Sequence, residues 1–130
     1  MIICKYKFDS SIYSNLIPEF NSGYTGYTVN DTTDGNIITR TIECDTLPTR
    51  IVFGYSTADL SVAEDAAKSL LEVLDINVNA TSMYCMFSNC INLTLLDVSN
   101  FDTSNVNNMS YMFNGCTNLT QLDVSNFNTS

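Results

Sequence analysis

Residues 79–104, NATSMYCMFSNCINLTLLDVSNFDTS, are followed directly by residues 105–130, NVNNMSYMFNGCTNLTQLDVSNFNTS. The two blocks are identical at 16 of 26 positions, which chance does not produce in adjacent segments. A repeat of this length is the sequence signature of an array of similar structural units. This repeat therefore decides the expected fold.

Each block has two halves with different hydrophobic periods. In the first half apolar residues recur at i, i+3, i+4 and i+7, which predicts one apolar face of two helical turns. In the second half the Leu-x-Val core alternates with period 2, as in a short strand. A helical turn followed by a strand at this period predicts a leucine-rich repeat. The apolar residues are Met83, Met86, Phe87, Cys90, Leu96 and Val98 in one block, and Met109, Met112, Phe113, Cys116, Leu122 and Val124 in the next.

A shorter copy precedes the two full repeats. Residues 71–76, LEVLDI, match residues 93–98, LTLLDV, and residues 61–70 read as a helix with Ser61 and Glu64 as a capping pair. We expect parallel strands near 71–77, 93–99 and 119–125, because stacked repeats bury apolar faces that one repeat cannot bury alone. The expected side-chain ladders are Leu74, Leu96, Leu122 and Ile76, Val98, Val124.

The first part of the chain lacks the repeat and reads as strands. Residues 2–8 alternate, Asp34-Gly35 predicts a hairpin between 24–29 and 37–44, and residues 50–53 predict another strand. We expect residues 1–58 to be a β-rich N-terminal cap or docking region. Residues 59–130 are expected to be a leucine-rich-repeat solenoid with a short first repeat. The expected fold class is thus an α/β repeat: short helical turns and a parallel sheet behind a β-rich cap.

Composition and charge exclude several classes of function. The chain has 5 Lys and Arg against 14 Asp and Glu, a net charge of -9, which disfavours binding to nucleic acid or an anionic membrane. No apolar run is long enough to span a membrane, so we expect no membrane insertion. No secretory signal is visible at residues 1–8. The chain has no His and five irregularly spaced Cys, so we expect no cofactor and no metal site.

The repeated elements Met-Phe, Cys, Leu-x-x-Leu-Asp-Val and Asn-Phe resemble those of BspA-like leucine-rich repeats, including the mycoplasma-type surface lipoprotein repeat. The resemblance covers roughly residues 71–130. It implies a bacterial surface protein that binds host proteins or other cells. Similar repeats occur in phage tail proteins, so the resemblance also implies a second location, the virion.

The candidate partner-binding residues lie on the expected concave face of the sheet. The carboxylates of Asp75, Asp97 and Asp123 are expected to form a column on the outward face of the sheet. This column either binds a cation or a basic partner, or only contributes to solubility. The loops at residues 100–104 and 126–130 are a competing surface. The candidate residues are Asp75, Thr94, Asp97, Ser99, Thr120, Gln121, Asp123 and Ser125.

We expect a non-catalytic protein-binding or adhesion module with a protein or cell-surface ligand, located outside the cell, on the cell surface or on a virion. The alternative is a structural or receptor-binding component of a phage tail. An enzyme is not expected, because the repeat duplicates each acidic residue, whereas paired catalytic carboxylates need unlike environments. No polar cap follows Leu119, Leu122 and Val124. We therefore expect a longer chain, or a second chain that covers the last repeat by self-association.

Overall fold

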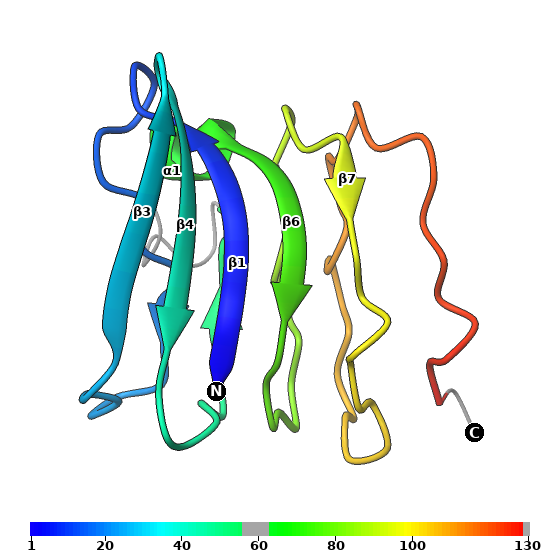
Figure 1. The fold of residues 1–130 in the computed structure, drawn as a ribbon. Coiled ribbons are helices and arrows are strands. Elements are labelled where there is room, and N and C mark those ends of the chain that lie inside the picture. Colours follow the sequence, from blue (N-terminus) through cyan, green and yellow to red (C-terminus); the bar gives the residue numbers. More distant parts are fainter. Residues whose placement is uncertain (56–62, 129–130) are drawn as a thin grey trace.

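The computed structural model describes residues 1–55 and 63–128. These residues form a five-stranded sheet of order β3-β4-β1-β6-β7, a separate two-stranded sheet and one short helix (Figure 1). The large sheet contains β1 (Ile2–Asp9), β3 (Thr28–Asp34), β4 (Ile37–Glu43), β6 (Leu70–Ile76) and β7 (Leu95–Leu96). The small sheet contains β2 (Glu19–Phe20) and β5 (Ile51–Val52), and the helix is α1 (Glu64–Ser69).

The N-terminal half of the large sheet is antiparallel, in the part of the chain where the sequence pattern predicts strands and one hairpin. The side chains of Cys4, Tyr6 and Phe8 on β1 are fully buried, and the residues between them are half-buried. The expected hairpin is confirmed, with β3 and β4 joined at Gly35, whose φ of 60° suits a tight turn. The first strand lies later in the chain than predicted: residues 24–27 are not strand, and β3 starts at Thr28 and includes residues 30–34, so the turn is tighter than expected. Strand β3 is exposed along its whole length.

Strand β6 joins the antiparallel half of the sheet to the repeats. It pairs antiparallel with β1 and parallel with β7, where Val73 lies opposite Leu96. The pairing with β1 is irregular between Lys5 and Tyr6, so that Leu74 becomes the extra residue of a bulge. Because a one-residue shift exchanges the two faces of a strand, Val73 is buried and Leu74 is only half-buried. The predicted ladder that starts at Leu74 is therefore wrong.

The expected α/β leucine-rich-repeat solenoid is wrong, because the described part of the chain is mostly β-sheet with one six-residue helix. Residues 84–89 form consecutive turns instead of a helix, with hydrogen bonds such as Met86 N–Met83 O (3.2 Å). Cys85 and Asn89 have φ values of 57° and 60°, which interrupt a right-handed helix. The i, i+3, i+4, i+7 spacing is compatible with tight turns that bury the same residues.

The strands expected in the repeats are also shorter than predicted. The parallel pairing of the first two is confirmed, but β7 contains two residues, and residues 119–125 form no strand. Among the described residues, no backbone hydrogen bond joins 93–99 to 119–125. The expected helix over 61–70 begins only at Glu64, after Ala63, without a side-chain cap. Ser61, the predicted cap, lies outside the described residues.

The two 26-residue blocks contact each other on the side opposite the large sheet. Backbone N–H groups of the first block donate to carbonyls of the second, and the rings of Phe87 and Phe113 stack with centroids 6.1 Å apart. Phe53 stacks on Phe87 at the same centroid distance. The rings of Phe53, Phe87 and Phe113 therefore form one aromatic stack that begins directly after β5 and includes both repeats.

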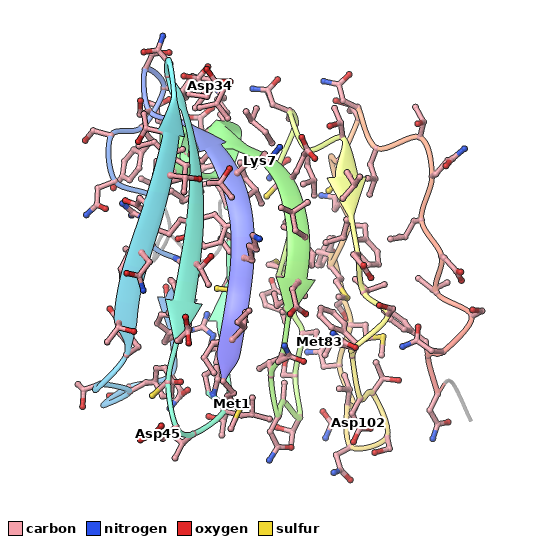
Figure 2. The ribbon with its side chains drawn as sticks, viewed as in Figure 1. Met1, Lys7, Asp34, Asp45, Met83 and Asp102 are labelled. Atoms are coloured by element: carbon pink, nitrogen blue, oxygen red, sulfur yellow. The ribbon has the colours of Figure 1, made fainter. Side chains whose placement is uncertain are left out.

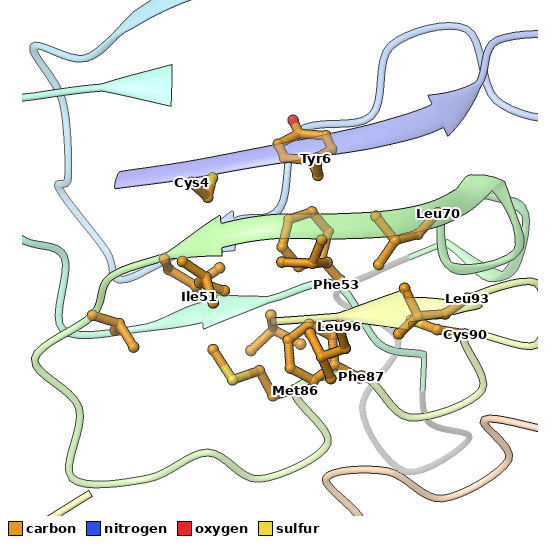
Figure 3. Packing of buried hydrophobic residues seen from close by; sticks show 14 of the residues in the cluster. Cys4, Tyr6, Ile51, Phe53, Leu70, Met86, Phe87, Cys90, Leu93 and Leu96 are labelled. Atoms are coloured by element: carbon orange, nitrogen blue, oxygen red, sulfur yellow. The ribbon is translucent and has the colours of Figure 1, made fainter. Parts of the chain in front are cut away.

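The hydrophobic core lies between the large sheet and this stacked layer (Figure 3). The Tyr6 ring meets the edge of Phe53 at 4.9 Å, and its hydroxyl donates to the carbonyl of Leu16 at 2.5 Å. Both the core and the large sheet include residues on either side of residue 58. The division of the chain into a cap over 1–58 and a repeat region over 59–130 stays a prediction.

Candidate functional site

A groove of about 360 Å³ opens where β7 and the chain after it face the second repeat. It is lined by four of the predicted partner-binding residues, Asp97, Ser99, Asp123 and Ser125. Leu95, Leu96, Val98 and Asn126 complete the lining. The groove exists because residues 119–125 do not continue the parallel sheet beyond β7.

The two carboxylates of the groove are held in identical local turns. Asp97 Oδ1 accepts the backbone N–H of Ser99 at 2.9 Å, and Asp123 Oδ1 accepts that of Ser125 at 2.9 Å. Hydrogen bonding from the Ser99 hydroxyl, and then from its backbone N–H, lowers the pKa of Asp97. Ser125 lowers the pKa of Asp123 in the same way. Both side chains are therefore ionised at neutral pH.

The wall between the carboxylates is apolar. The Leu95 side chain is 44% exposed, whereas Leu96 and Val98 are buried and fix the position of the chain beneath it. Among the described residues, neither Asp97 nor Asp123 forms an ion pair. The groove thus combines two uncompensated negative charges with an exposed aliphatic side chain.

The other predicted site residues lie outside the groove. The Asp75 carboxylate accepts hydrogen bonds from the side-chain amides of Asn77 (3.3 Å) and Asn100 (2.9 Å). The backbone N–H of Thr94 donates to Leu71 O at 2.9 Å. Thr120 and Gln121 are exposed. The register of β6 does not place Asp75 beside Asp97. Of the three carboxylates in the predicted column, only those of Asp97 and Asp123 therefore line the groove.

Asn126 is a groove residue that the sequence reasoning did not select. Its side-chain amide donates to the carbonyls of Val98 (3.2 Å), Ser99 (3.2 Å) and Phe101 (3.1 Å). It therefore holds the second repeat against the first at one end of the groove. The signal in the sequence was the repeated Ser-Asn-Phe triplet, in which the Asn recurs with the neighbouring apolar residues.

The described residues contain no group of three or more His, Cys, Asp or Glu side chains that could hold a metal ion. The five cysteines are free thiols. Burial raises the pKa of the Cys90 thiol well above its usual value, and burial also raises that of Cys116. Neither thiol is therefore activated as a nucleophile.

The family described as "Mycoplasma protein of unknown function, DUF285" matches residues 62–130. No curated protein and no solved structure matches. No helix in residues 1–55 or 63–128 is long and apolar enough to cross a membrane. Because the family match covers more than half of the chain, the protein belongs to this mycoplasma protein family, DUF285.

Proposed function

We propose that this chain is a non-catalytic binding module of a bacterial surface protein and that it binds a basic segment of a partner polypeptide. The groove between Asp97 and Asp123 carries the proposal, since it places two ionised carboxylates beside the exposed side chain of Leu95. A lysine or arginine side chain combines a cationic head with an aliphatic stem, which matches both features. The resemblance of the repeats to BspA-like surface proteins supports the location and the adhesive role.

Asp97 and Asp123 have similar surroundings, which favours a binding function over a catalytic one. A pair of catalytic carboxyl groups needs one raised and one ordinary pKa, so that one group is an acid and the other a base. Asp97 and Asp123 instead have the same turn, the same serine partner and a pKa shift in the same direction. Two exposed carboxylates also fall short of the six to eight oxygen ligands that calcium takes.

The proposal is tested with a displayed library of random dodecapeptides, screened against the whole chain. We expect selected peptides to contain lysine or arginine next to aliphatic residues. Their affinity should fall about tenfold in the Asp97→Asn/Asp123→Asn variant, since each exposed ion pair contributes up to about 1 kcal/mol. Affinity should also fall as the salt concentration rises, because salt screens charges at a surface.

Asp102 provides the matched control. Its Oδ1 accepts the N–H of Ser104 at 3.0 Å, and its pKa is lowered by the same kind of serine hydrogen bonds. It lies in the loop after β7, at the end of the molecule that also holds Met1 and Asp45 (Figure 2). Asp102→Asn changes the charge of one turn without touching the groove, so affinity should stay unchanged. Equal losses in the groove and control variants, or selected peptides without basic residues, would refute the proposal.

A further inference from the structure

A second hollow, of about 310 Å³, lies where the segment leading into β5 meets the start of the first repeat. Its walls come from residues 21, 49–52 and 81–84, so it shares no residue with the groove. Val52 of β5 lines it with a buried aliphatic side chain. The other lining residues carry polar groups: Asn21, Thr49, Arg50, Thr81, Ser82 and Tyr84. We call this hollow the hydroxyl pocket.

Hydrogen bonds hold the walls of the hydroxyl pocket together. The backbone N–H of Thr49 donates to Asn21 Oδ1 at 2.8 Å, which joins the segment after β2 to the segment before β5. The backbone N–H of Asn79 donates to Pro48 O at 2.9 Å, which joins the segment before β5 to the start of the repeat. The pocket is therefore formed before any ligand enters, so binding requires little ordering of the chain.

The charge of the hydroxyl pocket differs from that of the groove. Among the described lining residues, Arg50 is the one with a charged side chain, and an ion pair with Glu19 compensates it. An anionic ligand would have to compete with Glu19 for the guanidinium. The groove, in contrast, contains two carboxylates without an ion pair. The pocket therefore favours a ligand that is polar and neutral.

The polar groups of the pocket suit a ligand that carries hydroxyl groups. The hydroxyls of Thr49, Thr81 and Ser82 can each donate and accept a hydrogen bond. Ser82 Oγ accepts the backbone N–H of Tyr84 at 3.3 Å, which leaves its hydroxyl hydrogen to donate. Tyr84 adds a half-buried aromatic ring, which lies nearly perpendicular to the ring of Tyr111, with centroids 6.0 Å apart. A sugar has complementary features: hydroxyl groups that donate and accept, and an apolar face of C–H groups that packs on an aromatic ring.

We propose that the hydroxyl pocket binds a sugar unit of a neutral oligosaccharide. The C–H face of the sugar packs on Tyr84, and its hydroxyl groups form hydrogen bonds with Thr81 and Ser82. The volume of about 310 Å³ is at the lower end for ligand pockets, roughly 300–1,000 Å³, which suits a small ligand. A peptide matches less well, because side-chain hydroxyls line the pocket in place of a strand edge or an apolar groove. The inference goes beyond the proposed function, since it adds a second ligand of another class on a different surface.

The test screens the whole chain, coupled to a multivalent carrier, against an array of neutral and acidic oligosaccharides. Multivalent display makes weak binding at a single site measurable. We expect neutral oligosaccharides to bind. The affinity for one of these in soluble form is then measured by NMR titration of the uncoupled chain, with amide shifts expected at residues 49–52 and 81–84.

Variants of two lining residues locate the site. Tyr84→Ala should weaken binding by about tenfold or more, whereas Tyr84→Phe, which keeps the ring, should bind as the original chain does. Thr81→Val removes one hydroxyl with little change of shape and should weaken binding roughly two- to tenfold. Thr39→Val is the matched control, since Thr39 lies on β4 outside the pocket, and it should leave the affinity unchanged. Thermal unfolding of each variant establishes that it is folded.

Several outcomes would overturn the proposal. These are an array without bound neutral oligosaccharides, binding of acidic oligosaccharides alone, and equal affinities of Thr81→Val and Thr39→Val. Loss of the selected basic peptides in Thr81→Val would also overturn it and would assign the pocket to a polypeptide. The Asp97→Asn/Asp123→Asn variant should lose those peptides but keep the oligosaccharides, so the groove and the hydroxyl pocket can fail separately.

Discussion

Arg40 is a buried charged residue whose guanidinium is held by an ion pair and by further hydrogen bonds. Its guanidinium is largely buried above the Phe8 ring, 5.0 Å from the centroid, and donates two hydrogen bonds to Asp31 at 2.8 and 2.7 Å. Asn15 Oδ1 and the carbonyl of Leu16 accept from the same group. The Arg40 side chain thus connects the hairpin of β3 and β4 to the loop after β1. The sequence pattern did not indicate this connection.

Asp31→Asn should lower the free energy of unfolding by about 1–3 kcal/mol, since it leaves a buried guanidinium without its ionic partner. Chemical denaturation at neutral pH measures the change. Asp34→Asn, on the same exposed strand and with no ion pair among the described residues, is the control and should change stability by less than about 0.5 kcal/mol. Equal effects of the two substitutions would contradict the role assigned to Arg40.

The cysteines should differ in their reactivity with iodoacetamide. Hydrogen bonds from the Thr46 backbone N–H and the Tyr24 hydroxyl lower the pKa of Cys44 from 9.0, whereas burial raises that of Cys116 from 9.0. The thiolate is the reactive form, so Cys44, although its side chain is buried, should become reactive at lower pH than the half-buried Cys116. Cys4 and Cys90, both fully buried, should react only on unfolding. Peptide mapping at several pH values tests this order, and labelling of Cys90 first would contradict it.

At the scale of elements, the contact between the chain after β5 and the first repeat depends on a glycine. The N–H groups of Phe53 and Gly54 both donate to Met86 O, at 2.8 and 2.9 Å. A Cβ atom on Gly54 would collide with the backbone of Cys85 and Ser88. The absence of a side chain there lets the two segments approach closely enough for backbone hydrogen bonds, and it aligns Phe53 with Phe87.

Gly54→Ala should therefore destabilise the protein by about 3 kcal/mol or more, because the colliding atoms are backbone and cannot rotate away. Gly26→Ala is the comparison: its φ of +79° strains an L residue, but no atom lies within 4 Å of the new Cβ. The strain alone should cost about 1–2 kcal/mol. Thermal unfolding of both variants tests the difference, and a Gly54→Ala protein as stable as Gly26→Ala would disprove the close approach.

The antiparallel elements were predictable from sequence because their signals are local. The alternation in β1 and the Asp34-Gly35 turn each act over a few residues, and both were confirmed. The elements of the repeat were not predictable in the same way. The spacing of Met83, Met86 and Phe87 suits both a helix and a series of turns, and hydrogen bonds from Met83 and Phe87 to the next repeat favour the turns.

At the scale of the whole molecule, several aspartates make the fold sensitive to acid. Hydrogen bonds or an ion pair lower the pKa of Asp9, Asp31, Asp97, Asp102 and Asp123 below the 3.8 of an unperturbed carboxyl group. A carboxyl group with a lower pKa in the folded state stabilises that state above the unfolded pKa. The contribution disappears as the pH falls through the folded pKa.

The free energy of unfolding should therefore decrease as the pH is lowered from about 5 to below 3.8, in a window set by these aspartates. Denaturation at a series of pH values measures it. In Asp31→Asn the decrease should be smaller, because one of the contributing groups no longer titrates. A free energy that rises throughout this window would mean that relief of the net charge of -9 outweighs the lost hydrogen bonds.

The order of the amino acids alone indicates that residues 79–130 contain a repeat, that the hairpin turns at Gly35 and that apolar side chains line one side of β1. These are properties of neighbouring residues. The folded chain was needed to show that Leu74 forms a bulge, that the repeats turn where a helix was expected, and that Asp97 and Asp123 share a groove without Asp75. The reason is that strand register depends on pairing with distant residues of β1, and a shift of one residue exchanges the two faces of a strand.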